Sequence, residues 1–200
     1  MNEHSRQLVH LSGVVFVLFA QAWGGPAAAL YFLAGALFFL AYGGIVRKEA
    51  RKLKALEGRL REFALSLERE NVPRPFTGAF WFYFSCGLAF LAFPFQIASA
   101  ACIMLAVGDS LSTLVGIRYG MHHLLADKTL EGSIAFFATS FIAGLIFVSP
   151  IMSLGGAIAA TAAEMVPGIG KLRNLKGRGL IDDNLTIPLI AGAAMLLISI

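Results

Sequence analysis

Five carboxylates stand at the edges of strongly apolar stretches, where an acidic side chain is costly. Asp109 lies within an apolar run, and a central Asp in a membrane helix costs about 2.5–3.5 kcal/mol on insertion scales. Asp182-Asp183-Asn184 directly precede the last apolar run. Helix capping accounts for one of these three residues, and hard oxygen donors of this kind bind Mg²⁺ together with substrate phosphates. We therefore predict a Mg²⁺ site formed by Asp109, Asp182, Asp183 and Asn184, with Glu131 and Glu164 as further candidate site residues.

Glycines and basic residues are interspersed between positions 108 and 132. Gly108, Gly116, Gly120 and Gly132 have two interpretations. They allow close packing of membrane helices, or they allow the backbone to approach a phosphate. Four basic side chains, which apolar helix packing does not require, lie among these glycines: Arg118, His122, His123 and Lys128. Carboxylates for a metal and cations for phosphates indicate a nucleoside triphosphate as one substrate.

The elements that position these residues are apolar helices. Of 200 residues, 58% are hydrophobic and 14% are charged, against about 25% charged in an ordinary soluble domain. A spanning helix needs roughly 20 apolar residues. The sequence predicts an all-α bundle of about seven spans in one integral membrane domain, residues 1–200, with a lipid as the second substrate. The expected spans are Leu8–Trp23, Pro26–Val46, Gly78–Phe93, Pro94–Val115, Ser133–Ser149, Pro150–Val166 and Leu185–Ile200.

Charge placement predicts the orientation. Every one of the 16 Lys and Arg residues falls in four segments that alternate with pairs of spans, namely 1–7, 47–77, 116–132 and 167–184. This is the positive-inside pattern, so we expect a cytoplasmic N-terminus, a multi-pass protein of the cell membrane (the endoplasmic reticulum in a eukaryote), and a site on the cytoplasmic side. The net charge of +4 thus favours anionic lipid rather than nucleic acid. A cleaved signal peptide ending near Ala22 is the alternative for the first span.

Residues 47–77 form the one long hydrophilic segment. Leu53, Leu56, Leu60, Phe63 and Leu67 recur at helical spacing, and basic residues cover the other faces. We expect a cytoplasmic basic amphipathic helical insertion lying on anionic lipid. Packing against a second subunit, in a homo-oligomer, is the alternative.

Two blocks carry a resemblance to a known family. The stretch Gly108-Asp109-Ser-Leu-Ser112-Thr-Leu-Val-Gly116-Ile-Arg118-Tyr-Gly120, followed by Lys128-Thr-Leu-Glu131-Gly132-Ser, resembles the signature of the dolichol kinase and phytol kinase family, which includes CTP-dependent diacylglycerol kinase. Asp182-Asp183-Asn184-Leu-Thr-Ile-Pro188 resembles its second block. Glu3, Arg6 and His10 are similar to an N-terminal element, with Gln7 where the family often has lysine.

The resemblance implies a function and a division of roles. It implies transfer of the γ-phosphoryl group of CTP to the hydroxyl of a membrane lipid alcohol, most simply of the polyprenol type, with Mg²⁺ as the cation. Residues 108–188 would form the nucleotide- and metal-binding region. The implied catalytic residues are Asp109, Lys128 and Glu131, the nucleotide-binding residues are Gly108, Gly116, Arg118, Gly120, Lys128 and Gly132, and Arg6, His10 and Glu164 are further candidates. A CTP-dependent cytidylyltransferase of a lipid phosphate and a small cation- or proton-coupled transporter remain as alternatives.

Overall fold

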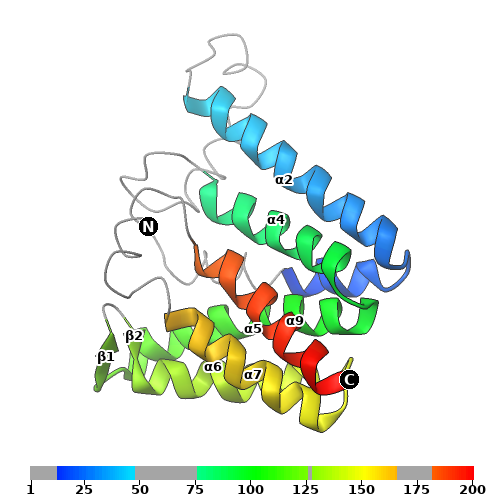
Figure 1. The fold of residues 1–200 in the computed structure, drawn as a ribbon. Coiled ribbons are helices and arrows are strands. Elements are labelled where there is room, and N and C mark those ends of the chain that lie inside the picture. Colours follow the sequence, from blue (N-terminus) through cyan, green and yellow to red (C-terminus); the bar gives the residue numbers. More distant parts are fainter. Residues whose placement is uncertain (1–12, 48–75, 126–127, 166–181) are drawn as a thin grey trace.

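The computed structural model describes residues 13–47, 76–125, 128–165 and 182–200. In that part of the chain seven helices and one short hairpin are present (Figure 1). A short helix covers residues 13–20. The other elements are α2 (Gly25–Arg47), α4 (Thr77–Ala92), α5 (Phe95–Tyr119), β1 (His123–Leu125), β2 (Lys128–Thr129), α6 (Leu130–Gly144), α7 (Pro150–Met165) and α9 (Asp183–Ser199). The all-α prediction is confirmed, and each predicted span overlaps one of these helices.

Proline and glycine set several helix boundaries. Pro94 is the N-cap of α5 and Pro150 is the first residue of α7, as expected for a residue that suits a first turn but lacks an amide donor. Gly24 has a φ of 79° at the break before α2, a conformation that glycine adopts without steric cost. These breaks allow consecutive helices to reverse direction over a few residues.

Helix α5 is the centre of the bundle. It packs against α6 and α9, while α2 packs mainly on α4 and α7 mainly on α9. The buried face of α5 consists largely of small side chains, among them Ala98, Ala101 and Ser110. Small residues let helix backbones approach closely where apolar burial alone gives little preference. The core is therefore close-packed around the helix that carries Asp109.

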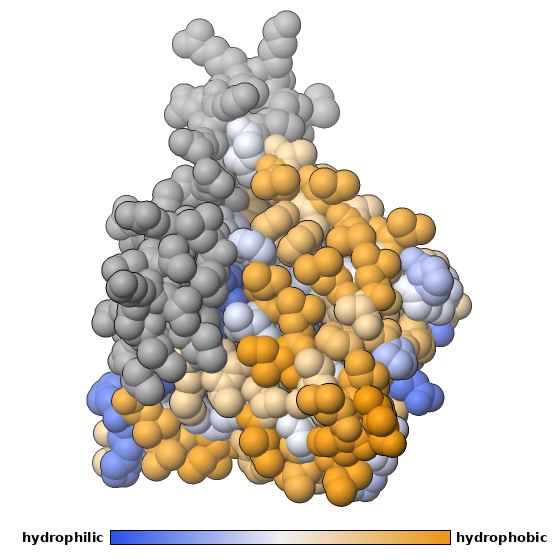
Figure 2. Space-filling model, in the orientation of Figure 1, coloured by the Kyte–Doolittle hydropathy of each residue, from blue (hydrophilic) through white to orange (hydrophobic). Residues whose placement is uncertain are grey.

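The exterior is strongly apolar. Large side chains such as Leu30, Leu37 and Ile142 are at least 65% exposed, and hydrophobic residues predominate among the described residues on the face shown in Figure 2. By length and composition, Gly25–Gly44 and Phe95–Tyr119 could cross a membrane, and three described helices are apolar but shorter. This surface is consistent with a membrane location.

Two local features differ from the sequence prediction. Helix α5 continues to Tyr119, four residues beyond the predicted end, so that Gly116 and Arg118 are helical. Residues 123–129, part of the segment 116–132 between two predicted spans, include the antiparallel pair β1–β2, with His123 opposite Thr129. Strands of two and three residues are too short to show an alternating pattern. Several predicted features lie outside the described residues: Arg6, His10, residues 48–75 of the predicted amphipathic insertion, and residues 167–181 of the last predicted cytoplasmic segment.

Candidate functional site

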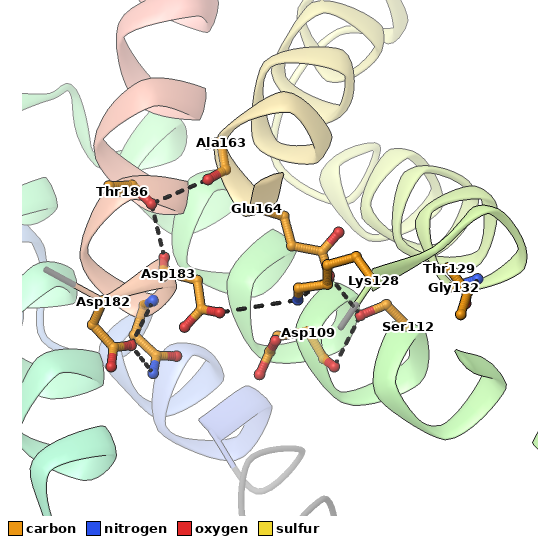
Figure 3. A network of polar contacts seen from close by, with 11 residues as sticks. Asp109, Ser112, Lys128, Thr129, Gly132, Ala163, Glu164, Asp182, Asp183 and Thr186 are labelled. Atoms are coloured by element: carbon orange, nitrogen blue, oxygen red, sulfur yellow. Dashed lines mark hydrogen bonds and ion pairs between the residues drawn. The ribbon is translucent and has the colours of Figure 1, made fainter. Parts of the chain in front are cut away.

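Four elements bring charged side chains together at one end of the bundle. Figure 3 shows Asp109 from α5, Lys128 from β2, Glu164 from α7 and Asp183 from α9 pointing toward one another. The positions are up to 74 residues apart in the sequence. Three formal negative charges therefore surround one formal positive charge, next to helices that consist mostly of apolar residues.

Lys128 lies at the centre of this cluster. Its Nζ is 2.7 Å from Oε1 of Glu164 and 3.9 Å from Oδ2 of Asp183. Burial lowers the pKa of Lys128, but attraction to the surrounding carboxylates of Glu164, Asp109 and Asp183 outweighs burial, and the net pKa is raised above its ordinary value. Lys128 is thus held as an ammonium ion, which suits binding of a phosphate and excludes a role as a base near neutral pH.

Glu164 is the most buried acid of the cluster. Its side chain is 1% exposed, and its Oε1 accepts hydrogen bonds from both Lys128 and the hydroxyl of Ser112, the latter at 3.0 Å. Its other oxygen, Oε2, is buried and has no hydrogen-bond partner among the described residues. Burial of a carboxylate oxygen without a hydrogen-bond donor costs free energy. Oε2 is therefore available to accept a hydrogen bond from a bound ligand.

The start of α9 separates the roles of two adjacent acids. Asp182 is the N-cap: its Oδ1 accepts from the backbone amide of Asn184 at 3.0 Å and from Nδ2 of Asn184 at 2.7 Å. Asp183, one residue later, faces Lys128 instead. Thr186 donates to the carbonyl of Ala163 at 3.3 Å, which ties the first turn of α9 to the residue before Glu164. Capping therefore accounts for Asp182, as the sequence allowed for one of the three.

The donor set fits a metal–nucleotide complex better than a metal held by protein alone. No three His, Cys, Asp or Glu side chains in the described ranges are grouped so that they could hold a metal ion by themselves. Mg²⁺, however, usually binds one or two carboxylates and completes its shell with phosphate oxygens and water. Asp109 and Asp183 offer such carboxylates. Oδ1 of Asn184 is a further hard oxygen, buried and without a hydrogen-bond partner in the described part of the chain.

Glu131 has a different environment. Its Oε2 accepts from the amides of Met121 and His122, and its Oε1 lies 2.7 Å from Nδ1 of His122. The His122 contact and these amides lower the pKa of Glu131 to about 2. A carboxylate of such low basicity is a poor proton acceptor. In the structure Glu131 fixes the turn that leads from α5 into the hairpin.

The glycines of the motif mark a close helix crossing. A Cβ on Gly132 would lie 3.0 Å from the carbonyl oxygen of Ser112 and 3.5 Å from Cα of Gly116, so α5 and α6 meet through backbone. Thr129, the N-cap of α6, accepts from the amide of Gly132 at 3.2 Å beside this crossing. Helix packing thus accounts for Gly116 and Gly132, and their role toward a nucleotide stays a prediction.

The remaining predicted residues lie around the crossing. Gly108 packs against Ser140 and Phe136 of α6, and Gly120 is the C-cap of α5. Arg118 is exposed and lies over the ring of Tyr119, where it is accessible to a soluble anion. Sequence reasoning gave Ser112 no role, although it lies within the motif that carries the resemblance.

Comparisons with known proteins give partial matches. The chain is 33% identical to the dolichol kinase of Saccharomyces cerevisiae over 91 residues, which is 43% of this chain and 17% of that protein. It is 28% identical to the phytol kinase of Synechocystis over 134 residues, 64% of this chain and 56% of that protein. These matches support a polyprenol- or phytol-kinase-like family.

A longer match carries no functional name. The chain is 26% identical to an uncharacterised protein of Rickettsia prowazekii over 194 residues, which is 94% of this chain and 90% of that protein. No family model and no solved structure matches. The two kinases are thus similar to part of the chain, and the chain spans little more than half of the phytol kinase.

Proposed function

We propose that this chain is a CTP-dependent lipid kinase that transfers the γ-phosphoryl group to the hydroxyl of a membrane lipid alcohol, most simply a polyprenol. The partial similarity to dolichol kinase and phytol kinase supports the reaction class. The observation that carries the proposal is the convergence of Asp109, Lys128, Glu164 and Asp183 at one end of an apolar bundle. A donor with charged phosphates and an acceptor with an apolar chain would meet at such a boundary.

Lys128 and the carboxylates of Asp109 and Asp183 would bind different parts of the metal–nucleotide complex. Phosphoryl transfer depends mainly on positioning and on neutralising the charge of the phosphoryl oxygens. Lys128 would exchange part of its contact with the surrounding acids for the β- and γ-phosphates, while Arg118 attracts the nucleotide from the aqueous side. Asp109 and Asp183, with Asn184, would hold Mg²⁺, which would neutralise phosphate charge when bound. The turn fixed by Glu131 and His122 would hold the hairpin, and with it Lys128, in register.

The acceptor would approach from the apolar side. We propose a multi-pass arrangement of about seven spans, with the cluster at the cytoplasmic side, because all Lys and Arg residues fall on one side of such an arrangement. The lipid hydroxyl would then reach the cluster at the membrane–water boundary while its chain stays in the bilayer. The predicted basic insertion, residues 47–77, would rest on the anionic surface.

Labelled CTP tests the proposal directly. Purified protein is incubated with Mg²⁺, a polyprenol, phytol or diacylglycerol, and CTP labelled at either the γ- or the α-phosphorus. A kinase moves only the γ label to the lipid and releases CDP. Movement of the α label with release of pyrophosphate would instead establish a cytidylyltransferase that acts on a lipid phosphate. Absence of both, together with Mg²⁺- or proton-driven flux in liposomes, would establish the transporter.

A further inference from the structure

The two oxygens of Glu164 are in unequal environments. Oε1 accepts from Lys128 at 2.7 Å and from Ser112 at 3.0 Å. Oε2 is buried with no hydrogen-bond partner in the described part of the chain. The two bonds to Oε1 fix the orientation of the carboxylate. This carboxyl oxygen is therefore held in place, away from water, without a hydrogen-bond partner among the described residues.

Only a limited set of donors could supply this hydrogen bond. The donor must be small at the point of contact because Oε2 is buried, and it must be compatible with a helix whose buried residues, such as Ala160 and Ala163, are mostly apolar. An alcohol hydroxyl at the end of an apolar chain meets both conditions. A second carboxylate or a phosphate oxygen does not, since each lacks a proton to donate at neutral pH and would be repelled.

We propose that Glu164 is the catalytic residue that receives the acceptor alcohol: its Oε2 accepts the hydrogen bond of the lipid hydroxyl while its Oε1 stays on Lys128. This inference rests on the proposed kinase function and names the residue that binds the second substrate. The hydroxyl oxygen then lies beside the ammonium group that binds the phosphates. Glu164 thereby places the nucleophile next to the phosphorus that it attacks.

The chemical step balances with these groups. The hydroxyl oxygen forms the new bond to the γ-phosphorus, and the hydroxyl proton passes to Oε2 of Glu164. The bond from the γ-phosphorus to the bridging oxygen of CTP breaks, and its electron pair leaves with CDP. Glu164 later releases the proton to water as the lipid phosphate departs. Lys128 stays protonated throughout, so within the Lys128–Glu164 pair only Glu164 can accept the hydroxyl proton.

The test separates binding of the nucleotide from transfer to the lipid. Glu164→Gln keeps the shape and an oxygen for Lys128 but cannot take a proton. We expect it to lower transfer to the alcohol by about a hundredfold or more, the usual contribution of a positioned base. The dissociation constant for Mg–CTP, measured by calorimetry, should change by less than about fivefold. Lys128→Ala should show the opposite pattern, with affinity for CTP lost. Glu164→Asp, which restores a carboxylate one methylene shorter, should recover part of the transfer rate.

The controls decide between outcomes. Thr161→Ala removes a hydroxyl on the same helix, and in the described part of the chain this hydroxyl donates to the carbonyl of Ala157. This variant should leave both measurements unchanged. If the wild-type protein moves no γ label to any alcohol, the kinase function itself fails. If the wild type is active and Glu164→Gln transfers phosphate at a near-normal rate, the role of Glu164 is excluded. Loss of CTP affinity in Glu164→Gln to the extent seen in Lys128→Ala would also overturn it, since Glu164 would then only support the lysine.

Discussion

The Nζ of Lys128 lies 2.7 Å from a carboxylate oxygen of Glu164, and the Glu164 side chain is 1% exposed. Removal of one partner leaves the other charge buried and unpaired, which costs more than the pair contributes. We expect Lys128→Ala to lower the free energy of unfolding by about 1–3 kcal/mol. The double variant Lys128→Ala/Glu164→Gln should recover part of this loss. Reversible denaturant unfolding of the four proteins of the double-mutant cycle measures the coupling, and additive losses would contradict it.

The two acids on either side of Lys128 should be required for turnover and not for folding. Asp109→Asn and Asp183→Asn should each lower phosphoryl transfer at least about a hundredfold, because charge-stabilising groups in such reactions commonly contribute several kcal/mol. Each variant should still insert and show an unchanged helical circular dichroism spectrum. Asp182→Asn keeps a capping oxygen at the start of α9 and should be much less affected. Chelation of Mg²⁺ should abolish activity, and added Mg²⁺ should restore it. Near-normal rates in the Asn variants across a Mg²⁺ titration would exclude a metal role.

The Glu131–His122 contact predicts a stability change in acid. The folded pKa of Glu131 is lowered from 4.5 to about 2. The contribution of this contact is therefore fully present above pH 4.5, and it is lost as the pH falls toward 2. The difference in melting temperature between wild type and Glu131→Gln should be constant above pH 4.5 and should shrink below it. A difference that persists undiminished at pH 2 would show that the glutamate acts through packing.

The crossing of α5 and α6 should not tolerate a side chain at Gly132. A Cβ there would lie 3.0 Å from the backbone carbonyl of Ser112, and a backbone atom cannot move aside cheaply. Gly132→Ala should destabilise the protein by about 1–3 kcal/mol and displace the neighbouring hairpin. Gly44→Ala is the matched control: nothing lies within 4 Å of a Cβ at this helical position, so it should be neutral or stabilising by up to about 1 kcal/mol. Equal melting temperatures for the two variants would contradict the crossing.

The membrane orientation can be tested with single cysteines in a variant that lacks Cys86 and Cys102. Cysteines placed at Lys52 and Lys176, outside the described residues, should react with impermeant reagents only from the cytoplasmic side. A cysteine at Ser149, between α6 and α7, should react only from the other side. Labelling of either lysine position from outside would contradict the seven-span arrangement.

The sequence predicted the helices well and the contacts between them poorly. Apolar runs bounded by Pro94 and Pro150 located the helices to within a few residues, because burial and proline act locally. The Lys128–Glu164 pair joins residues 36 positions apart, and no spacing rule relates them. Asp182 and Asp183 are adjacent residues of the same type, so the sequence does not distinguish their roles. Only the direction of the backbone at the start of α9 makes one a cap and turns the other toward Lys128.

The hydrogen bond from Thr186 to Ala163 joins α7 and α9 immediately beside Glu164 and Asp183. The proposed donor and acceptor sites are therefore carried by helices tied together within one turn, with Lys128 in contact with both acids. In-line attack of the lipid hydroxyl on the γ-phosphorus would then be a single displacement at phosphorus. A chiral γ-phosphoryl group should consequently emerge in the lipid product with inverted configuration, whereas passage through a phosphorylated side chain would retain it.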